Sequence, residues 1–333
     1  MRSGRRQCIM PPSDIPPELS VVVTAFNRRR FVKTALKSIL EQSYERDRYE
    51  VILVKNFSDR DIDGFSAANG IKVVYSEEKH IGDMALGGIT LARGKVVLLL
   101  DDDDVFLPGK LSRVSSVMSD GTVGYYHNGF VPFASSVPPG DGSKMSSLSM
   151  ALDSTSSCTE LLKAMDEGAT FNSSCIAFQR EIMGRGLGLI KGTPTGPGFS
   201  LMVASLVSGR RCLLSRERLT GYRFRMPKSQ AAALREKIMA VGRASATVQL
   251  DLRRVTGESI RTVLRYKADE LAVRLYLLGT VSSRVTAKRA SLRLLSAPTC
   301  RKIPYRISLL LLVLFYPVLP HILRTRVWNL KMI

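Results

Sequence analysis

The first part of the chain alternates short apolar runs with amphipathic stretches. Residues 31–40 carry apolar side chains at helical spacing, and residues 83–92 form a second, Gly-containing helical stretch. The apolar runs are rich in β-branched residues, as strands buried on both faces are. We expect strands at residues 19–25, 49–54, 71–76 and 95–100. Strands that alternate with helices in this way predict an α/β fold, with a parallel sheet and helices on both of its faces.

The pattern is less regular after the fourth apolar run. Residues 108–118 have a helical pattern, and residues 130–158 are rich in Ser, Pro and Gly. A loop of this length inside a domain is usually functional or mobile, so we expect a flexible flap there. Further strands are expected at residues 122–128 and 173–178, a further helix at 198–208, and the sequence LTGYRFR follows at 219–225.

After Pro227 the helical period dominates. The apolar residues from Leu234 to Val255 share one helical face, cations mostly occupy the others, and Gly257 ends the helix. Residues 260–278 repeat the arrangement and also end at a glycine. Two interpretations are open: a helical subdomain with a solvated charged face, or a pair of helices that lie on a membrane surface.

Residues 307–323 (ISLLLLVLFYPVLPHIL) contain no Lys, Arg, Asp or Glu. A helix of this length spans roughly 26 Å, which is short for a hydrocarbon core of about 30 Å. Pro317 and Pro320 interrupt the segment, and cations flank it on both sides. Because these cations suit phosphate headgroups, we prefer a re-entrant or in-plane membrane anchor to a full span. A buried core helix is the remaining alternative.

Charge divides the 333-residue chain into two parts. Residues 1–204 carry 23 basic and 23 acidic side chains, whereas residues 205–333 carry 26 and 6, so the net charge of +20 belongs to the second part. Such a surface attracts anions, either membrane lipids or nucleic acid. Residues 226–302 have few aromatic side chains for base stacking, which disfavours nucleic acid. Five scattered cysteines without a CxxC pair, and the absence of an apolar signal segment near the start, favour a reducing, cytosolic setting.

The strongest chemical signal is VVLLLDDDD at residues 96–104, an apolar strand that ends in four aspartates. Ligands of open parallel sheets bind at the carboxyl ends of the strands. Four adjacent carboxylates repel one another unless a hard divalent cation offsets them. Alternate side chains of an extended segment share a face, so Asp101 and Asp103 can point at one metal ion or sugar. Asp104 is placed to cap the helix that begins near Pro108.

With these motifs the chain resembles family 2 of the inverting glycosyltransferases, which have the GT-A fold, a Rossmann-like nucleotide-diphospho-sugar transferase fold. The resemblance rests on LSVVVTAFNRRRFVKTALKSILEQSY, YEVILVKNFSD and ARGKVVLLLDDDDVFLPGKL. It is specific over residues 19–118 and weaker up to residue 225, where LTGYRFR is similar to the family's terminal L-x-x-Y-R-x-H.

The resemblance implies a donor site for a nucleotide sugar. In it, Asp101 would touch the ribose, and Asp103 would bind the divalent metal, Mn²⁺ or Mg²⁺, that bridges the donor's diphosphate, with Asp101 as the second metal ligand. The metal would offset the charge that develops on the leaving diphosphate. The other donor-binding residues would be Thr24, Ala25, Phe26, Asn27, Lys55, Asn56, Gly82, Asp83 and Asp102.

Several positions depart from the family pattern. Lys55 and Asn56 stand where acidic residues are common, Leu86 stands where an Arg is frequent, and Arg225 replaces the terminal His. An Arg can also hold a diphosphate.

The residue that takes the acceptor's proton is not evident from the sequence. The family places an acid at the start of the helix before the last strand, but no carboxylate occurs between Glu181 and Glu217. Asp166 and Glu167 are our candidates for this catalytic base, with Asp153 behind them. The alternative is a catalytically degenerate scaffold or binding protein at the membrane.

We therefore expect a metal-assisted glycosyltransferase of the hexosyltransferase type, acting in glycan biosynthesis on a lipid-linked or glycan acceptor. It would bind anionic lipid at the cytoplasmic face of the cell membrane through a C-terminal anchor, and no nucleic acid. The expected parts are a flexible N-terminus (1–18), the GT-A domain (19–225), a basic amphipathic helical region (228–302) and a hydrophobic anchoring segment with a basic tail (303–333).

Overall fold

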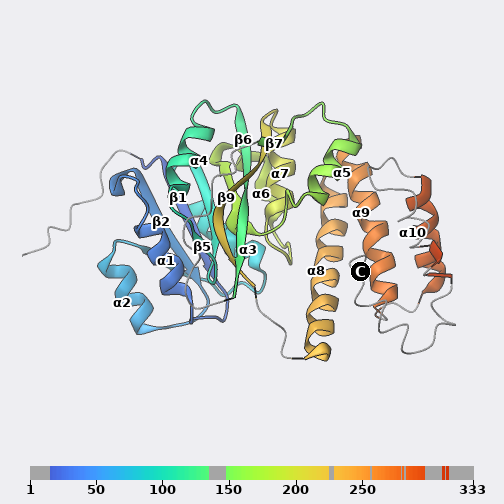
Figure 1. Cartoon of the computed structure of the whole chain (residues 1–333), viewed down its shortest axis with the longest axis horizontal. Coiled ribbons are helices and arrows are strands. Elements are labelled where there is room, and N and C mark those ends of the chain that lie inside the picture. Colours follow the sequence, from blue (N-terminus) through green and yellow to red (C-terminus); the bar gives the residue numbers. More distant parts are fainter. Residues whose placement is uncertain are drawn as a thin grey trace, which may run out of the picture.

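The computed structural model describes most of the chain. The described residues are 16–134, 148–224, 229–255, 257–278, 280, 283–296, 310, 311, 313 and 314. They form an α/β domain and, at one end of it, a group of long helices (Figure 1). Arg225 and most of the predicted anchor at 307–323 lie outside the described residues.

Four parallel strands form one half of the sheet, in the order β3-β2-β1-β4. They are β1 (Leu19–Ala25), β2 (Tyr49–Lys55), β3 (Lys72–Tyr75) and β4 (Val96–Asp101). The helices between them are α1 (Val32–Leu40), α2 (Arg60–Ala68) and α3 (Ile81–Leu91). The predicted alternation of strands and helices is confirmed, and α2 is an additional helix.

The other half of the sheet is mixed and continues as β8-β6-β9-β5, with β7 paired to β9. Its strands are β5 (Val105–Phe106), β6 (Val123–Phe133), β7 (Leu148–Leu152), β8 (Ile176–Gln179) and β9 (Arg211–Arg223). The helices of this part are α4 (Lys110–Met118), α5 (Cys158–Asp166), α6 (Met183–Ile190) and α7 (Gly198–Val207). The flap predicted at 130–158 is wrong at both ends, because β6 runs through Phe133 and β7 begins at Leu148. Residues 135–147 lie outside the described part.

Side chains of the central strands alternate between two buried layers. Val21 and Val23 pack with α1, α2 and α4, whereas Val22 faces α3, α6 and α7. Close packing of α3 depends on Gly88, where an added Cβ would lie 2.4 Å from Val22 Cγ1 and 2.8 Å from Val54 Cγ2. Both faces of the sheet are therefore covered, and its open positions are the strand ends.

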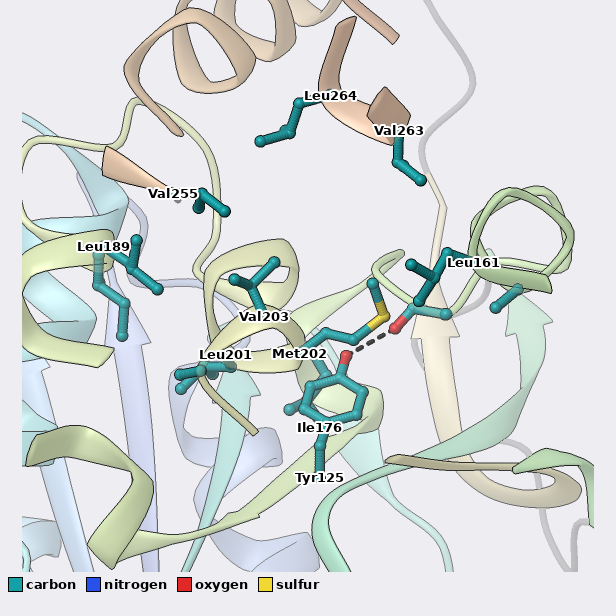
Figure 2. Packing of buried hydrophobic residues seen from close by; sticks show 14 of the residues in the cluster. Tyr125, Leu161, Ile176, Leu189, Leu201, Met202, Val203, Val255, Val263 and Leu264 are labelled. Atoms are coloured by element: carbon teal, nitrogen blue, oxygen red, sulfur yellow. Dashed lines mark hydrogen bonds between the residues drawn. The ribbon is translucent and has the colours of Figure 1, made fainter. Parts of the chain in front are cut away.

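The helical region consists of α8 (Gln230–Arg254), α9 (Glu258–Leu277) and α10 (Arg284–Ser296), which pack in this order away from the α/β domain (Figure 1). The two predicted helices are confirmed. Their apolar side chains share one core with the domain, as Val255, Val263 and Leu264 do with Leu189 and Val203 (Figure 2). No helix within the described ranges is long and apolar enough to cross a membrane.

His127 is a buried side chain of β6, only 6% exposed. Its Nε2 lies 2.7 Å from the carbonyl oxygen of Phe171. Burial lowers the pKa of His127 to about 4 and Lys110 acts in the same direction, while the hydrogen bond to Phe171 opposes them. The imidazole is therefore neutral in the folded protein at neutral pH.

We expect acid to destabilise the protein through His127. An unfolded histidine has a pKa of about 6.5, so between about pH 6.5 and 4 the unfolded chain binds a proton that the folded chain excludes. This contribution to stability is present above pH 6.5 and is lost as the pH falls, by on the order of 2–3 kcal/mol at pH 4. Between pH 7 and pH 4.5, the free energy of unfolding should fall less in His127→Gln than in the unmodified protein. An equal fall in both would contradict this prediction.

Candidate functional site

The site lies where the direction of strand order changes. The chain passes from β1 outward to β2 and β3, whereas β4 lies on the other side of β1. Thr24 is in register with Asp101, so the carboxyl ends of β1 and β4 are adjacent. In open α/β sheets this arrangement leaves a crevice in which ligands bind.

Asp101 is held by hydroxyl groups from two sides. Its Oδ1 accepts hydrogen bonds from Ser173 Oγ at 2.8 Å and from Thr24 Oγ1 at 3.5 Å. Its own N–H donates to Ser174 Oγ at 3.0 Å. Burial raises the pKa of the Asp101 carboxyl, and the neighbouring Asp103 adds to that effect. The orientation of this carboxylate is thus fixed before any ligand binds.

Arg223 of β9 fixes the turn that follows β4. Its backbone N–H donates to Asp104 Oδ1 at 2.7 Å, and its Nε donates to the carbonyl oxygen of Asp103 at 2.8 Å. The guanidinium lies between the rings of Phe31 and Phe133, with its carbon 3.9 and 4.3 Å from their centres. The predicted capping role of Asp104 is wrong, because α4 begins after Gly109, at φ 80°, without a side-chain cap. Asp104 instead accepts the hydrogen bond from the Arg223 N–H, so its carboxylate faces β9 and not the start of α4.

Arg28 lies over the second and third aspartates. Its Nε donates to Asp102 Oδ2 at 2.9 Å and its Nη1 to Asp103 Oδ2 at 2.8 Å, and Nη2 also contacts Asp102. Burial raises the pKa of Asp102 to about 7 against the effect of Arg28, and the carboxylates of Asp101 and Asp103 raise it further. One guanidinium therefore does not offset the negative charge of this turn.

Among the predicted donor residues, Asn27 and Asn56 connect the ends of β1 and β2. The Asn27 N–H donates to Asn56 Oδ1 at 2.8 Å, and Asn56 Nδ2 donates to Asn27 Oδ1 at 3.0 Å. Asn27 has φ 56°, a conformation that Asn tolerates better than most residues. Ala25 is buried within β1, while Phe26 is partly exposed beside it. The structure thus brings the residues 24–27 together with the aspartates.

Lys55 is fully buried at the end of β2. Its Nζ lies 2.6 Å from Asp63 Oδ1 and donates to the carbonyl oxygen of Phe57 at 3.0 Å and to the Tyr75 hydroxyl at 3.2 Å. The structure therefore engages this ammonium group with α2 and β3. Its predicted contact with the donor stays a prediction.

We expect Asp63→Ala to destabilise the protein more than Lys55→Met does. The alanine leaves the buried Lys55 ammonium without its carboxylate, at a cost on the order of 2–3 kcal/mol for a pair that is partly exposed. Methionine fills the lysine's space and leaves Asp63, whose side chain is 31% exposed, to water, at a cost under about 1 kcal/mol. Urea denaturation measures the loss of unfolding free energy in both variants. A larger loss in Lys55→Met than in Asp63→Ala would rule out a structural ion pair.

Gly82 and Asp83, also predicted to bind the donor, contact the connection between α6 and α7. Asp83 Oδ1 accepts a hydrogen bond from the Gly192 N–H at 2.7 Å. A Cβ at Gly82 would lie 2.1 Å from Thr193 Oγ1, so only glycine fits there. These contacts hold the segment that precedes α7.

The three candidates for the catalytic base have other partners. Asp166 lies 3.4 Å from Lys267 Nζ of α9, and Glu167 lies 3.9 Å from Arg216 Nη2. Asp153 accepts a hydrogen bond from the Thr155 hydroxyl at 2.6 Å. Their assignment as a base stays a prediction.

Arg28, Ser173 and Arg223 are site residues that the sequence analysis missed. A signal existed for Arg28, because Arg28, Arg29 and Arg30 directly follow β1 at the same sheet edge as four aspartates. No comparable signal singles out Ser173, which is 72 residues from Asp101. Within the described residues, no group of three or more His, Cys, Asp or Glu side chains is placed to hold a metal ion alone.

Comparison with known proteins identifies the domain. Residues 20–183 match the description "Glycosyl transferase family 2". The chain carries a glycosyltransferase domain of family 2. An uncharacterized glycosyltransferase of Nostoc sp. is 30% identical over 118 residues, which are 33% of this chain and 36% of that protein. One of Haemophilus influenzae is 30% identical over 102 residues, 30% of this chain and 34% of that protein. The chain thus matches about a third of the length of these relatives.

Solved structures show that the domain has the same fold. S. aureus TarS in complex with UDP-GlcNAc has a TM-score of 0.56 at 13% identity, over 95% of this chain and 89% of that chain. The mannosyltransferase PcManGT from Pyrobaculum calidifontis, in complex with GDP-Man and Mn²⁺, has a TM-score of 0.57 at 15% identity, over 98% and 87%. The predicted mixed α/β, GT-A-like fold of this glycosyltransferase domain is confirmed.

Proposed function

We propose that the protein transfers a sugar, with inversion, from a nucleotide-sugar donor to an acceptor hydroxyl. The observation that carries this proposal is the aspartate turn at the crevice between β1 and β4, where Arg28 offsets only part of the carboxylate charge. The two solved structures of similar fold bind UDP-GlcNAc and GDP-Man. The donor would lie in this crevice, against residues 24–27 and Asp101.

The side chains at the turn suit a divalent cation such as Mn²⁺ or Mg²⁺. They supply only carboxylate oxygens, the ligands that hard cations prefer. Burial raises the pKa values of Asp101 and Asp102, and repulsion between neighbouring carboxylates adds to the rise, which a bound cation would oppose. Asp101 and Asp103 would hold the ion, and the donor's phosphates would supply further ligands, as is common for Mg²⁺. When bound, the ion supplies Lewis acidity toward the leaving diphosphate.

The chain's own residues orient the parts of this site. Ser173 and Thr24 hold the Asp101 carboxylate toward the crevice, and Arg223 fixes the backbone of the next two aspartates. Arg28 is 41% exposed at its side chain, so its guanidinium can also meet a phosphate oxygen in a bidentate contact. These contacts hold the carboxylates in position before the donor binds, so binding would not have to order them.

We also propose that the acceptor is lipid-linked and that the enzyme acts at the cytoplasmic face of the cell membrane. The charge excess of residues 205–333 and the apolar segment 307–323 with its flanking cations support this. Pelleting with vesicles that contain anionic lipid, compared for the full chain and a chain that ends at residue 302, tests it. Equal pelleting of both would contradict an anchor at 303–333.

A thermal-shift screen tests donor binding. UDP, GDP, UDP-GlcNAc and GDP-Man are added with and without Mn²⁺, since a ligand that binds only the folded state raises the unfolding midpoint. We expect a shift with one nucleotide family that requires the metal. No shift with any of the four would overturn the transferase proposal and favour a degenerate scaffold. A shift without turnover of any donor would also favour the scaffold.

A further inference from the structure

A cavity of about 580 Å³ lies between the α/β domain and the helical region. This volume is within the range of small-molecule sites. The α/β domain contributes Asp101, Asn172, Ser173 and Phe199 to its lining, among others. The helical region contributes Asp251 of α8 and Arg274 of α9. Because Asp101 lines it, this cavity adjoins the crevice in which the donor is proposed to bind.

Unpartnered polar atoms gather at this cavity. Asn172 Nδ2, Arg274 Nε and both carboxylate oxygens of Asp251 are buried without a hydrogen-bond partner among the described residues. Buried polar groups are nearly always paired with protein or water, so these atoms can pair with the hydroxyl groups of a ligand that enters the cavity. Asn172 also has φ 55°, and such backbone strain is typical of functional sites.

The lining of the cavity suits a sugar. Phe171, which is 45% exposed, lines it and packs against Phe130 and Tyr222 at ring-centre distances of 5.5 and 5.4 Å. The C–H face of a sugar ring can pack on such an aromatic surface while its hydroxyls bond the polar groups. Small residues, Gly196 and Ala244 among them, keep the space open.

Asp251 is a carboxylate of this cavity for which the described residues provide no ion-pair partner. It is 1% exposed on α8, next to Ser200 in the first turn of α7. The nearby Ser200 Oγ donates to the carbonyl oxygen of Leu189 at 3.2 Å, so both Asp251 oxygens are available to a ligand in the cavity. In contrast, Glu270 is held by Lys267 at 3.2 Å and Arg274 at 2.8 Å.

We propose that this cavity binds a sugar hydroxyl of the acceptor and that Asp251 is the catalytic base for it. The inference rests on the proposed transferase function. The acceptor O–H proton passes to an Asp251 oxygen while the acceptor oxygen bonds to the anomeric carbon. The bond from that carbon to the donor's diphosphate breaks, and its electron pair leaves with the nucleoside diphosphate.

The electrostatics of Asp251 agree with this role. Burial raises its pKa to about 7, and Arg254 and Ser200 oppose the rise. The other charged groups at the cavity are Asp101 on β4 and three residues of α9: Lys267, Glu270 and Arg274. A base whose pKa is close to the working pH transfers protons efficiently.

Variants of the full chain test this assignment. The donor selected by the thermal-shift screen is incubated with each variant, and release of nucleoside diphosphate is followed with water as the acceptor. We expect Asp251→Asn to lower this release at least about 100-fold, because general bases contribute about 10²–10⁴. Its Mn²⁺-dependent shift with the nucleoside diphosphate should be unchanged. Glu236→Gln, which alters an exposed carboxylate on the same helix, should match the unmodified protein in both assays.

Chemical rescue separates a base from a structural residue. Formate added to Asp251→Ala should restore part of the release, since it supplies a carboxylate in the vacated space, and it should have no effect on the unmodified protein. Release by Asp251→Asn within threefold of the unmodified rate would overturn the inference and leave the transferase proposal intact. Failure of the unmodified protein to bind any donor would overturn both. Loss of activity without rescue, together with a lowered unfolding midpoint, would assign Asp251 a structural role.

Discussion

Replacement of Asp103 by alanine is expected to abolish the Mn²⁺-dependent stabilisation by nucleotides and to lower sugar transfer by about 10³-fold or more. Asp103 is a buried carboxylate of the aspartate turn, and its Oδ2 lies 2.8 Å from Arg28 Nη1. Without it, the crevice loses one oxygen ligand, and Arg28 can pair with Asp102 alone. Electrostatic stabilisation of a leaving group is usually among the largest catalytic effects.

The matched variants are Asp103→Asn and Asp47→Ala. Asparagine keeps the volume at position 103 and separates loss of charge from loss of packing, while Asp47 is an exposed carboxylate far from β4 in the sequence. Thermal shift with and without Mn²⁺, and initial rates of nucleoside diphosphate release, provide the comparison. A shift in Asp103→Ala equal to that of the unmodified protein would show that the metal is held elsewhere.

The central sheet could be predicted because its strands are buried on both faces. The runs LSVVVTA and KVVLLL have no polar face, and only a parallel sheet covered by helices accommodates several such runs in sequence. Elements with weaker patterns were missed. α6 (MGRGLGLI) contains three glycines, and α2 (RDIDGFSAA) begins with charged residues, so local propensity did not indicate a helix in either. Tertiary packing stabilises them, since α2 contacts β3 and α1, and α6 contacts α3, α7 and α8.

The position of the aspartate turn could also be predicted, but its partners from distant parts of the chain could not. An apolar strand that ends in acidic residues places these at a sheet edge, whatever the rest of the fold. Ser173 reaches the site from the short 3-10 helix before β8, Arg223 from β9 and Asp251 from α8. The register of distant elements decides which residue arrives there. No local pattern in the sequence contains that register.

The second large effect concerns Tyr125, which links β6 to the wall of the proposed sugar cavity. Its ring is fully buried near Ile176 and Met202, and its hydroxyl donates to the carbonyl oxygen of Ala169 at 2.6 Å (Figure 2). Ala169 begins the turn that carries Phe171, Asn172 and Ser173. We expect Tyr125→Ala to lower the free energy of unfolding by about 3–5 kcal/mol, the usual cost of removing a buried aromatic side chain.

Tyr125→Phe separates the packing of the ring from its hydrogen bond. It keeps the ring and leaves the buried Ala169 carbonyl without this donor, so we expect a loss of about 1–2 kcal/mol. Because the turn at 169–173 then loses its tether to β6, sugar transfer should fall more than stability alone explains. Leu187→Ala, at a residue that is 45% exposed, should cost under about 1 kcal/mol and leave transfer unchanged. Guanidinium denaturation gives the free energy of unfolding, and transfer rates are measured at a temperature where every variant is folded. Full transfer by Tyr125→Phe would mean that the turn is positioned by its other contacts, chiefly the Ser173 bond to Asp101.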